Sequence, residues 1–255
     1  MKTYDLVAGL QQEYEKYTDE DKKVWKILFN RQADQLKLVA DEAYLRGIVD
    51  IDFKADEIPD FRKVNKRLAE TTGWEIKVVP GIIDQANFFK MLSNKQFPSS
   101  TWLRSMKSLD YLSEPDMFHD AFGHMPLLTN KVFCDFFHAI GKLGVNYLNH
   151  SDIIEMLGRV YWFTIEFGLI QNNQELKIYG AGILSSIGET KYSRSDNPER
   201  RPFDIKEIMY TDFDNTVIQE KYFVINSFQQ LIDSVPVMEK IMKDLCTKKA
   251  MFTPS

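Results

Sequence analysis

The sequence predicts a mostly α-helical protein of packed helices with a few short β-strands. Apolar residues recur at helical spacing through most of the chain, whereas the β-branched runs that could form strands are brief. The 255 residues and the 44% hydrophobic content suit one large globular domain, or two at most. Because no internal repeat, low-complexity tract or obvious linker divides the chain, we expect a single domain over residues 1–255.

The first third of the chain is predicted to be helical with short extended breaks. Trp25, Leu28 and Phe29 illustrate the helical spacing, and Pro80–Gly81 closes a β-branched run. The predicted elements are two or three helices in 1–48, an extended link over 49–62, a helix over 63–72 that completes a helical N-terminal segment 1–72, a short strand in WEIKVVPGII (74–83), and a helix over 83–93.

The rest of the chain alternates helices with turns and a few strands. Pro115–Asp116 favours a helix start, since proline fits a first helical turn and acidic residues suit its positive end. The predicted elements are that helix, ending near Gly123 and Pro126, helices over 131–149 and 152–170, a strand over 175–179, a turn at Gly180–Gly182, a polar loop over 190–204, a hairpin or short strands within 207–225, and a C-terminal helix over 226–247 interrupted at Pro236.

Composition excludes several classes of function. A net charge of -5 and a pI near 5.5 do not favour nucleic acid or an anionic membrane as partner. No run of ~18 apolar residues and no signal-peptide core occurs. Cys134 and Cys246 are too few for a disulfide framework, which favours a reducing cytoplasm. No long heptad run occurs, so we expect a monomer rather than a coiled-coil assembly.

Two of the four histidines stand close together in the stretch PDMFHDAFGHMP. His119 and His124 are five residues apart, and positions i and i+5 of an ideal α-helix point about 140° apart. Both rings can therefore reach one metal ion only if the helix ends or distorts between them, which Gly123 permits. The spacing differs from that of the HExxH motif, whose histidines share one face.

Glu166 is an isolated carboxylate in the apolar stretch VYWFTIEFGLI (160–170). A helix that is apolar all round is buried, and a buried carboxylate requires a partner. One explanation is an ion pair with Arg159, two helical turns earlier. The other explanation is that Glu166 binds a metal ion.

Together, His119, His124 and Glu166 would form a 2-His-1-carboxylate triad, which is characteristic of non-haem Fe(II) oxygenases. Some zinc hydrolases also bind their metal through two histidines and a glutamate. Asp120 follows His119 where such enzymes carry a general base, but the two histidines do not have the spacing of those enzymes. Gly180-x-Gly182-x-x-Ser185 nearly matches a dinucleotide-binding fingerprint. Its serine and the lack of repeated βαβ units make that interpretation weak.

Three segments resemble the signatures of the tetrahydropterin-dependent aromatic amino acid hydroxylases: EPDMFHDAFGHMPLL (114–128), VYWFTIEFGLI (160–170) and IYGAGILSSIGE (178–189). The resemblance spans a catalytic core of about 75–230 and implies the fold of that family. It implies an Fe(II) enzyme that uses O₂ and tetrahydrobiopterin, or a related tetrahydropterin, to hydroxylate an aromatic amino acid. Phenylalanine is the expected substrate, giving tyrosine, because short bacterial members mostly use it; tryptophan and tyrosine stay open.

The resemblance also assigns roles to individual residues. With the first iron ligand already at position 119, it implies no N-terminal regulatory domain of the animal type. Asp120 stands where animal members carry Glu, so we expect it to act through water. Phe89, adjacent to Phe88, is expected to lie in the core. The assigned residues are His119, His124 and Glu166 for iron, Arg104, Asp116, Pro115, Trp162, Gly182 and Ser185 for the amino acid, and Gly81, Ile83, Phe88 and Asp120 for the pterin.

Overall fold

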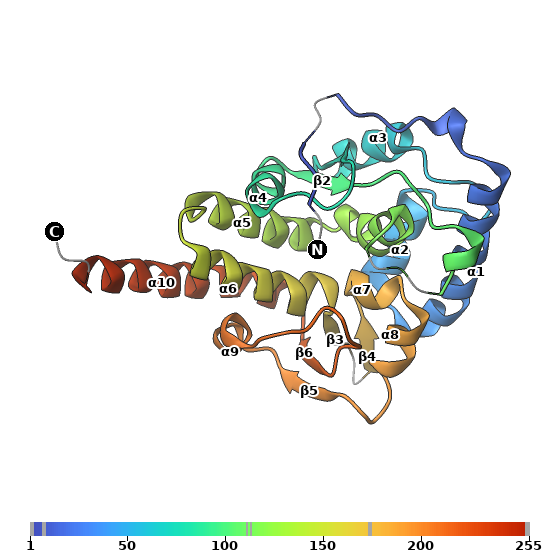
Figure 1. Cartoon of the computed structure of the whole chain (residues 1–255). Coiled ribbons are helices and arrows are strands. Elements are labelled where there is room, and N and C mark those ends of the chain that lie inside the picture. Colours follow the sequence, from blue (N-terminus) through green and yellow to red (C-terminus); the bar gives the residue numbers. More distant parts are fainter. Residues whose placement is uncertain (1–2, 7–8, 111, 113, 173–174, 253–255) are drawn as a thin grey trace.

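The computed structural model describes residues 3–252, apart from 7–8, 111, 113 and 173–174. The described chain is mostly helical, as predicted, with two small sheets (Figure 1). Its helices are α1 (Asp19–Val39), α2 (Glu42–Asp50), α3 (Phe61–Thr71), α4 (Gln85–Ser93), α5 (Lys131–Asn146), α6 (Ser151–Tyr161), α7 (Ala181–Leu184), α8 (Ile187–Tyr192), α9 (Ile205–Tyr210) and α10 (Phe228–Phe252). Short 3₁₀ turns are η1 (Tyr14–Lys16), η2 (Met106–Ser108) and η4 (Met125–Thr129), and π-helical turns are η3 (His119–His124) and η5 (Trp162–Glu166).

The N-terminal helices form where the apolar spacing predicts them. Thr18 caps the start of α1. Its side chain accepts a hydrogen bond from the backbone N–H of Asp21, while the Asp21 carboxylate accepts one from the Thr18 backbone. This capping box satisfies donors that a helix start leaves free. Trp25 is fully buried, and its indole N–H donates to the Lys54 carbonyl at 2.8 Å. That bond attaches the extended link after α2 to the first helix.

The strands form two separate sheets. Strands β1 (Glu75–Val78) and β2 (Gln96–Ser99) pair in parallel, with Glu75 opposite Gln96. The second sheet has the order β4-β3-β6-β5 and consists of β3 (Leu169–Asn172), β4 (Glu175–Ile178), β5 (Glu199–Pro202) and β6 (Lys221–Ile225). Strands β3 and β4 are antiparallel, whereas β6 is parallel to both β3 and β5. In Figure 1 this sheet lies below α6, beside α8 and α9.

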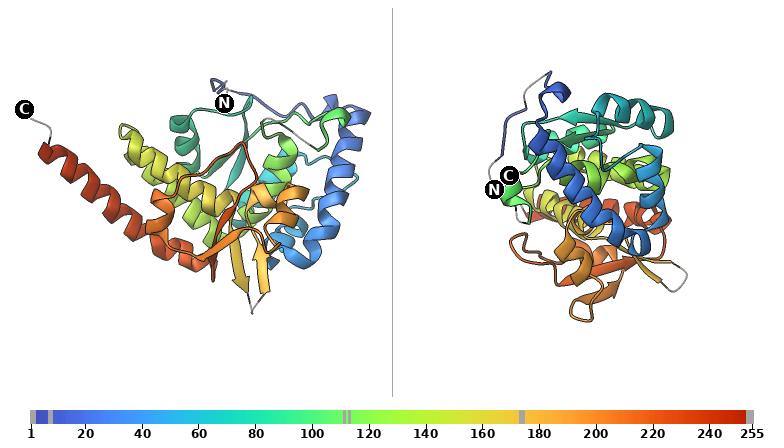
Figure 2. Two further views of the ribbon diagram at one scale, coloured as in Figure 1. Left: turned by 60° about the horizontal axis from the view of Figure 1, so that its bottom comes forward. Right: turned by 90° about the vertical axis from the view of Figure 1, so that its right-hand side faces the viewer.

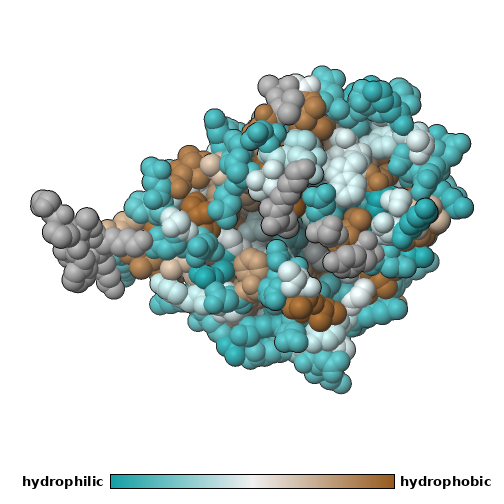
Figure 3. Space-filling view, in the orientation of Figure 1, coloured by the Kyte–Doolittle hydropathy of each residue, from teal (hydrophilic) through white to brown (hydrophobic). Residues whose placement is uncertain are grey.

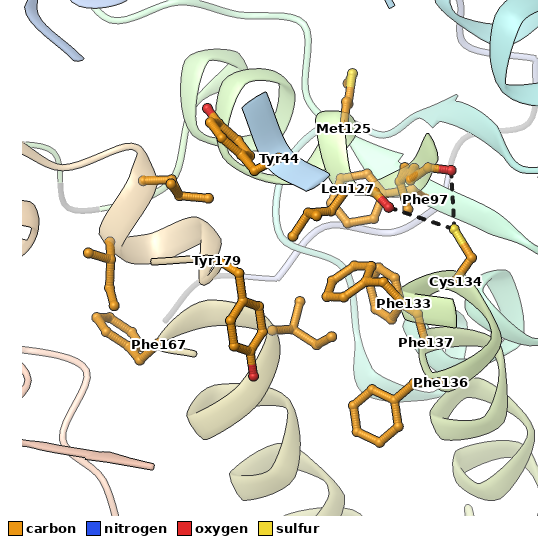
Figure 4. Close-up of a cluster of buried hydrophobic side chains, with 14 of the residues drawn as sticks. Tyr44, Phe97, Met125, Leu127, Phe133, Cys134, Phe136, Phe137, Phe167 and Tyr179 are labelled. Atoms are coloured by element: carbon orange, nitrogen blue, oxygen red, sulfur yellow. Dashed lines mark hydrogen bonds between the residues drawn. The ribbon is translucent and has the colours of Figure 1, made fainter. Parts of the chain in front are cut away.

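The core is rich in aromatic rings, most of which serve ordinary packing. Phe133, Phe136 and Phe137 all come from α5 and are fully or almost fully buried (Figure 4). Phe137 stacks on Trp74 with ring centroids 5.2 Å apart. The Cys134 thiol on the same helix lies 3.1 Å from the Leu128 carbonyl, so this cysteine is a buried packing residue.

Three predicted elements in the second half of the chain are wrong. The helix predicted over 152–170 ends earlier: α6 stops at Tyr161, η5 follows, and Leu169 and Ile170 lie in β3. A continuous apolar run is compatible with either a buried helix or a buried strand, which explains the error. The predicted turn at Gly180–Gly182 is instead the start of α7, with Gly180 at its N-cap. The polar loop predicted over 190–204 contains the end of α8 and strand β5.

The C-terminal region differs from the prediction in two further ways. The hairpin or strands predicted within 207–225 are the end of helix α9, a long loop and strand β6, which pairs in parallel with β5. Helix α10 runs through Pro236 without interruption. Pro236 is exposed, while Leu231 and Met238 on either side are fully buried. Packing of the flanking turns thus holds the helix together around the missing N–H.

On the face that Figure 3 shows, the surface is mostly hydrophilic and the hydrophobic side chains lie in small groups. The last turns of α10 extend away from the body of the molecule (Figure 2). Among the described residues, no helix combines the length and the apolar composition needed to cross a membrane.

Candidate active site

The two histidines and Glu166 lie on π-helical turns, which resolves their unusual spacing. His119 and His124 are the first and last residues of η3, and Glu166 ends η5. A π turn closes i→i+5 hydrogen bonds, so residues five apart come to lie above one another. The predicted distortion between the histidines is confirmed. A Cβ on Gly123 would lie 2.9 Å from the Ala181 carbonyl, so this glycine also lets α7 pass close by.

The three side chains converge on one point. His119 Nε2 lies 3.2 Å from His124 Nε2 and 3.6 Å from Glu166 Oε2, and His124 Nε2 lies 3.2 Å from Glu166 Oε1. Ligands about 2.1 Å from one metal ion, at angles of 90–109°, are roughly 3.0–3.4 Å apart. Two of the three distances fall in this range, and the third, 3.6 Å between His119 and Glu166, is slightly longer. The arrangement suits a single ion bound to all three, and no other group of three or more such side chains occurs among the described residues.

Hydrogen bonding presents the correct nitrogen of His119. The Ser185 hydroxyl donates to the Ala181 carbonyl at 2.8 Å, so its oxygen accepts from His119 Nδ1–H at 2.9 Å. Nδ1 then carries the proton, and the lone pair of Nε2 faces His124 and Glu166. Ser185 thus fixes both the tautomer and the ring orientation of His119.

The protonation states also suit a metal ion. Burial lowers the pKa of His119 to about 4, so its ring is neutral near pH 7. Burial would raise the pKa of Glu166, but the adjacent His124 and His119 outweigh it and lower that pKa to about 2. A neutral imidazole beside an ionised carboxylate is the state in which these groups bind metals.

The alternative partner for Glu166 is excluded. Arg159 forms an ion pair with Asp212 at 2.7 Å and donates to the Met209 carbonyl at 3.3 Å. Glu166 instead faces the histidines and the Tyr161 hydroxyl, which further lowers its pKa. The buried ion pair between Arg159 and Glu166 is therefore wrong as an explanation.

Arg104 is held rigidly by Asp116. Its Nε and Nη2 donate to the two Asp116 oxygens at 2.9 Å each, and its Nη1 donates to the Leu109 carbonyl at 3.2 Å. Asp116 is fully buried, and it also accepts from the backbone N–H groups of Arg104 and His119. Of the five guanidinium N–H groups, these contacts with described residues use three. One N–H remains on each terminal nitrogen, which is the fork that binds a carboxylate bidentately.

These side chains surround one cavity of about 800 Å³. This size falls within the range of small-molecule sites. Asp116 lies behind Arg104 and does not line the cavity. All other residues assigned from the sequence do: His119, His124, Glu166, Arg104, Pro115, Trp162, Gly182, Ser185, Gly81, Ile83, Phe88 and Asp120.

The residues expected to contact the pterin also line this cavity. Phe88 lines the cavity, whereas the adjacent Phe89 is buried beneath it, against the backbone of Gly144. Asp120 accepts hydrogen bonds from the Ser100 backbone N–H at 2.8 Å and from its hydroxyl at 3.1 Å. Burial raises the pKa of Asp120 to about 7. Ser100 thus fixes the orientation of this carboxyl at the cavity wall.

The glycines of YGAGILSS are explained by close backbone contacts. A Cβ on Gly180 would lie 2.4 Å from the Glu166 carbonyl and 2.3 Å from the Gly168 nitrogen. A Cβ on Gly182 would lie 3.0 Å from the Phe167 ring and 3.1 Å from the Glu166 carbonyl. Both glycines let the start of α7 cross the turn that carries Glu166. This contact, rather than a phosphate, accounts for the near match to a dinucleotide fingerprint.

The sequence did not reveal several residues of the cavity wall. Tyr161 lies in a stretch we singled out, but helical spacing alone could not show which side it faces. Phe97 packs on His124 with ring centroids 4.8 Å apart, and it lies on β2, a strand that was not predicted from the sequence. Asn215 and Val217 lie on the loop between α9 and β6, where no periodic pattern points to a site.

The chain belongs to the family of biopterin-dependent aromatic amino acid hydroxylases, whose profile matches residues 5–252. This membership excludes the zinc hydrolase. Among curated relatives, the phenylalanine-4-hydroxylase of Chromobacterium violaceum is 45% identical over 226 residues, which cover 88% of this chain and 76% of that protein. The phenylalanine-4-hydroxylase of Ralstonia nicotianae is 42% identical, with 88% and 72% covered.

Solved structures agree with these similarities. The C. violaceum phenylalanine hydroxylase with bound Fe(III) and 7,8-dihydrobiopterin is 44% identical and superposes with a TM-score of 0.87, covering 92% of this chain and 86% of that one. The iron- and phenylalanine-bound structure of the same enzyme is 41% identical, with a TM-score of 0.85 and coverage of 94% and 90%. The mostly helical fold that we predicted is therefore confirmed.

Proposed function

We propose that this protein is a phenylalanine 4-monooxygenase that depends on iron and a tetrahydropterin and converts L-phenylalanine and O₂ to L-tyrosine. The observation that carries the proposal is the convergence of His119, His124 and Glu166 at a cavity that Arg104 also faces. The relatives named phenylalanine-4-hydroxylase, at 40–45% identity, support phenylalanine over tryptophan and tyrosine.

His119, His124 and Glu166 would hold Fe(II). A triad of this kind leaves coordination positions free for other ligands. Bound iron and tetrahydropterin together supply the activation of O₂ and the electrons for hydroxylation. Ser185 keeps the lone pair of His119 Nε2 directed at the metal position.

Arg104 would bind the α-carboxylate of the substrate through its two remaining N–H groups, with Asp116 holding the guanidinium in place. Trp162 and Pro115 would then flank the aromatic ring, and Gly182 would leave room beside it. Fixing the carboxylate at one end and the ring at the other would hold the ring near the triad and exclude water.

The pterin would lie against Gly81, Ile83 and Phe88, with the Phe88 ring stacked on it. Asp120 would contact the pterin through a water molecule, since its side chain is short and turned toward Ser100. Tetrahydrobiopterin or a related tetrahydropterin is the cofactor we propose.

The organisation of the chain follows from the same proposal. Residues 1–255 would act as a single catalytic domain, with a helical N-terminal segment 1–72, a core at about 75–230 and a C-terminal helix. We propose a monomer in the cytoplasm; the two free cysteines, one of them buried, are compatible with a reducing compartment. Light scattering on the purified protein measures the oligomeric state directly.

Replacing a metal ligand tests the central proposal. His124→Ala removes one of three ligands, so both bound iron and tyrosine formation should fall to background, measured by metal analysis and pterin-dependent oxygen uptake. His138 is the matched control: its ring contacts the Ser93 carbonyl and lies outside the cavity, so His138→Ala should retain iron and activity. A fully active His124→Ala variant would rule out the triad.

A further inference from the structure

Trp162 is constrained on three sides. Phe213 stacks on its indole with ring centroids 4.3 Å apart and planes within 12°, and Phe167 packs at 4.5 Å. The indole N–H donates to Gln219 Oε1 at 2.8 Å. The N–H of a half-buried indole usually has a partner, but a backbone carbonyl or water would serve. The use of the Gln219 side chain as the acceptor therefore suggests a functional role for it.

Gln219 is itself fixed by a chain of hydrogen bonds. Its Nε2 donates to the Lys221 carbonyl at 2.7 Å, so its amide oxygen must face Trp162 and the group cannot flip. Its backbone N–H donates to Glu189 Oε1 at 3.1 Å, and the other Glu189 oxygen accepts from the Tyr222 hydroxyl at 2.9 Å. Gln219 is only 6% exposed. The acceptor for the indole thus has one orientation.

This network borders the cavity rather than the distant core. Trp162 and Glu189 both line the cavity, as do Asn215 and Val217 of the loop that carries Phe213 and Gln219. The segment between α9 and β6 therefore both forms a wall of the cavity and sets the angle of the indole.

We infer that Gln219 is a positioning residue for the aromatic ring of the substrate and acts through the indole N–H of Trp162. The inference rests on the proposed function. Gln219 does not touch the substrate. It holds the ring that does, so it controls how well the reacting carbon is aligned, and with it the fraction of pterin oxidation that yields tyrosine.

Gln219→Leu removes the acceptor at similar side-chain volume. Loss of a typical hydrogen bond corresponds to about a twofold to tenfold change in an equilibrium constant. We expect a rise of that size in the KM for phenylalanine and a fall in tyrosine formed per pterin oxidised, with the pterin KM and the iron content unchanged. Gln229→Leu, the same change at an exposed position of α10, should behave as wild type.

A double-mutant comparison tests whether Gln219 acts through the indole N–H of Trp162. Trp162→Phe removes the N–H, so adding Gln219→Leu to it should change KM and coupling less than twofold. Equal effects of Gln219→Leu in both backgrounds would overturn the inference, as would wild-type kinetics for Gln219→Leu or a parallel loss of pterin binding and thermal stability. If Gln219→Leu does not fold, Gln219→Asn, which keeps the amide and retracts its oxygen, gives the same comparison. A wild-type protein inactive on phenylalanine would instead refute the proposed function.

Discussion

At the scale of single residues, three side chains of the site are each held by hydrogen bonds to a neighbouring residue. Asp116 holds Arg104, Ser185 holds His119, and Ser100 holds Asp120. Each supporting bond has a distance near 2.9 Å and removes rotational freedom before any ligand binds. The cost of ordering these groups is thus met in folding rather than in binding.

Arg104→Lys tests the carboxylate fork. Lysine keeps the charge but lacks two parallel N–H groups and cannot satisfy both Asp116 oxygens. Loss of a charge-assisted bidentate contact is worth roughly 1.5–3 kcal/mol, so the KM for phenylalanine should rise about tenfold to a hundredfold in steady-state kinetics. Iron content should stay at the wild-type level, because Arg104 lies outside the triad. An unchanged KM would mean that another residue holds the carboxylate.

The adjacent phenylalanines of α4 should have separable effects. Phe88 lines the cavity, so Phe88→Ala should raise the pterin KM several-fold to about tenfold. The reason is the loss of an aromatic stack on the pterin, which contributes roughly 0.5–1.5 kcal/mol beyond the burial of surface area. Phe89 is 2% exposed and fills the space beside Gly144, so Phe89→Ala should lower the free energy of unfolding by about 3–5 kcal/mol. Steady-state kinetics and denaturant unfolding on both variants make the measurement. The opposite pattern, with Phe89→Ala impairing pterin use and Phe88→Ala impairing stability, would contradict the assignment of Phe88 to the pterin.

Much of the site at this scale could be predicted from the sequence because the residue types reveal the chemistry. A carboxylate in an apolar run, as at Glu166, is costly without a partner, and the two nearby histidines supply one. Supporting contacts, such as that of Ser185 with His119, could be predicted only through the family resemblance. Gln219 could not be predicted at all, because nothing in the pattern of residues 211–220 distinguishes this glutamine.

At the scale of elements, glycines at crossing points determine how close the segments around the site can pack. Gly47 of α2 faces η4, the turn directly after His124: a Cβ at Gly47 would lie 2.0 Å from the Pro126 carbonyl oxygen. Gly123 and Gly180 serve similarly where α7 meets the two π turns. These contacts are with backbone atoms, which cannot move aside as a flexible side chain can.

Two glycine-to-alanine variants test this point. Gly47→Ala should lower the free energy of unfolding by about 1–3 kcal/mol through overpacking, and it should reduce iron retention because Pro126 is two residues from His124. Gly158 of α6 has open space where a Cβ would lie, with no contact within 4 Å, so Gly158→Ala should instead stabilise the protein by about 0.5–1 kcal/mol through helix propensity. Denaturant unfolding and metal analysis measure both; a stable, iron-replete Gly47→Ala variant would show that η4 can shift.

Element types were predictable from the sequence where the periodicity was long, as in α1 and α5. They were not predictable where partners distant in the chain decide the structure. Strand β3 looks like a continuation of α6 in sequence, and only pairing with β4 and β6 fixes it as a strand. The π turns are also invisible to periodicity, since each inserts one residue into an otherwise helical pattern.

At the scale of the whole molecule, the site joins segments that are distant in the chain. The triad links η3 and η5, Ser185 follows α7, and Arg104 precedes η2. In an unfolded chain these groups are far apart, so a metal ion finds its three ligands together only in the folded state. Binding of the ion should therefore stabilise the whole domain.

This linkage predicts a measurable difference between iron-loaded and iron-free protein. Free Fe(II) at a hundred times its dissociation constant should stabilise the fold by about 2.7 kcal/mol. At roughly 2–4 °C per kcal/mol for a chain of this size, removal of iron by a chelator should lower the Tm by about 5–10 °C, and added Fe(II) should restore it. Anaerobic calorimetry makes the measurement. His124→Ala is the control: with one ligand missing, its Tm should respond little to iron or chelator. A shift in that variant as large as in the wild type would show that iron stabilises the fold from somewhere other than the His119, His124 and Glu166 cluster.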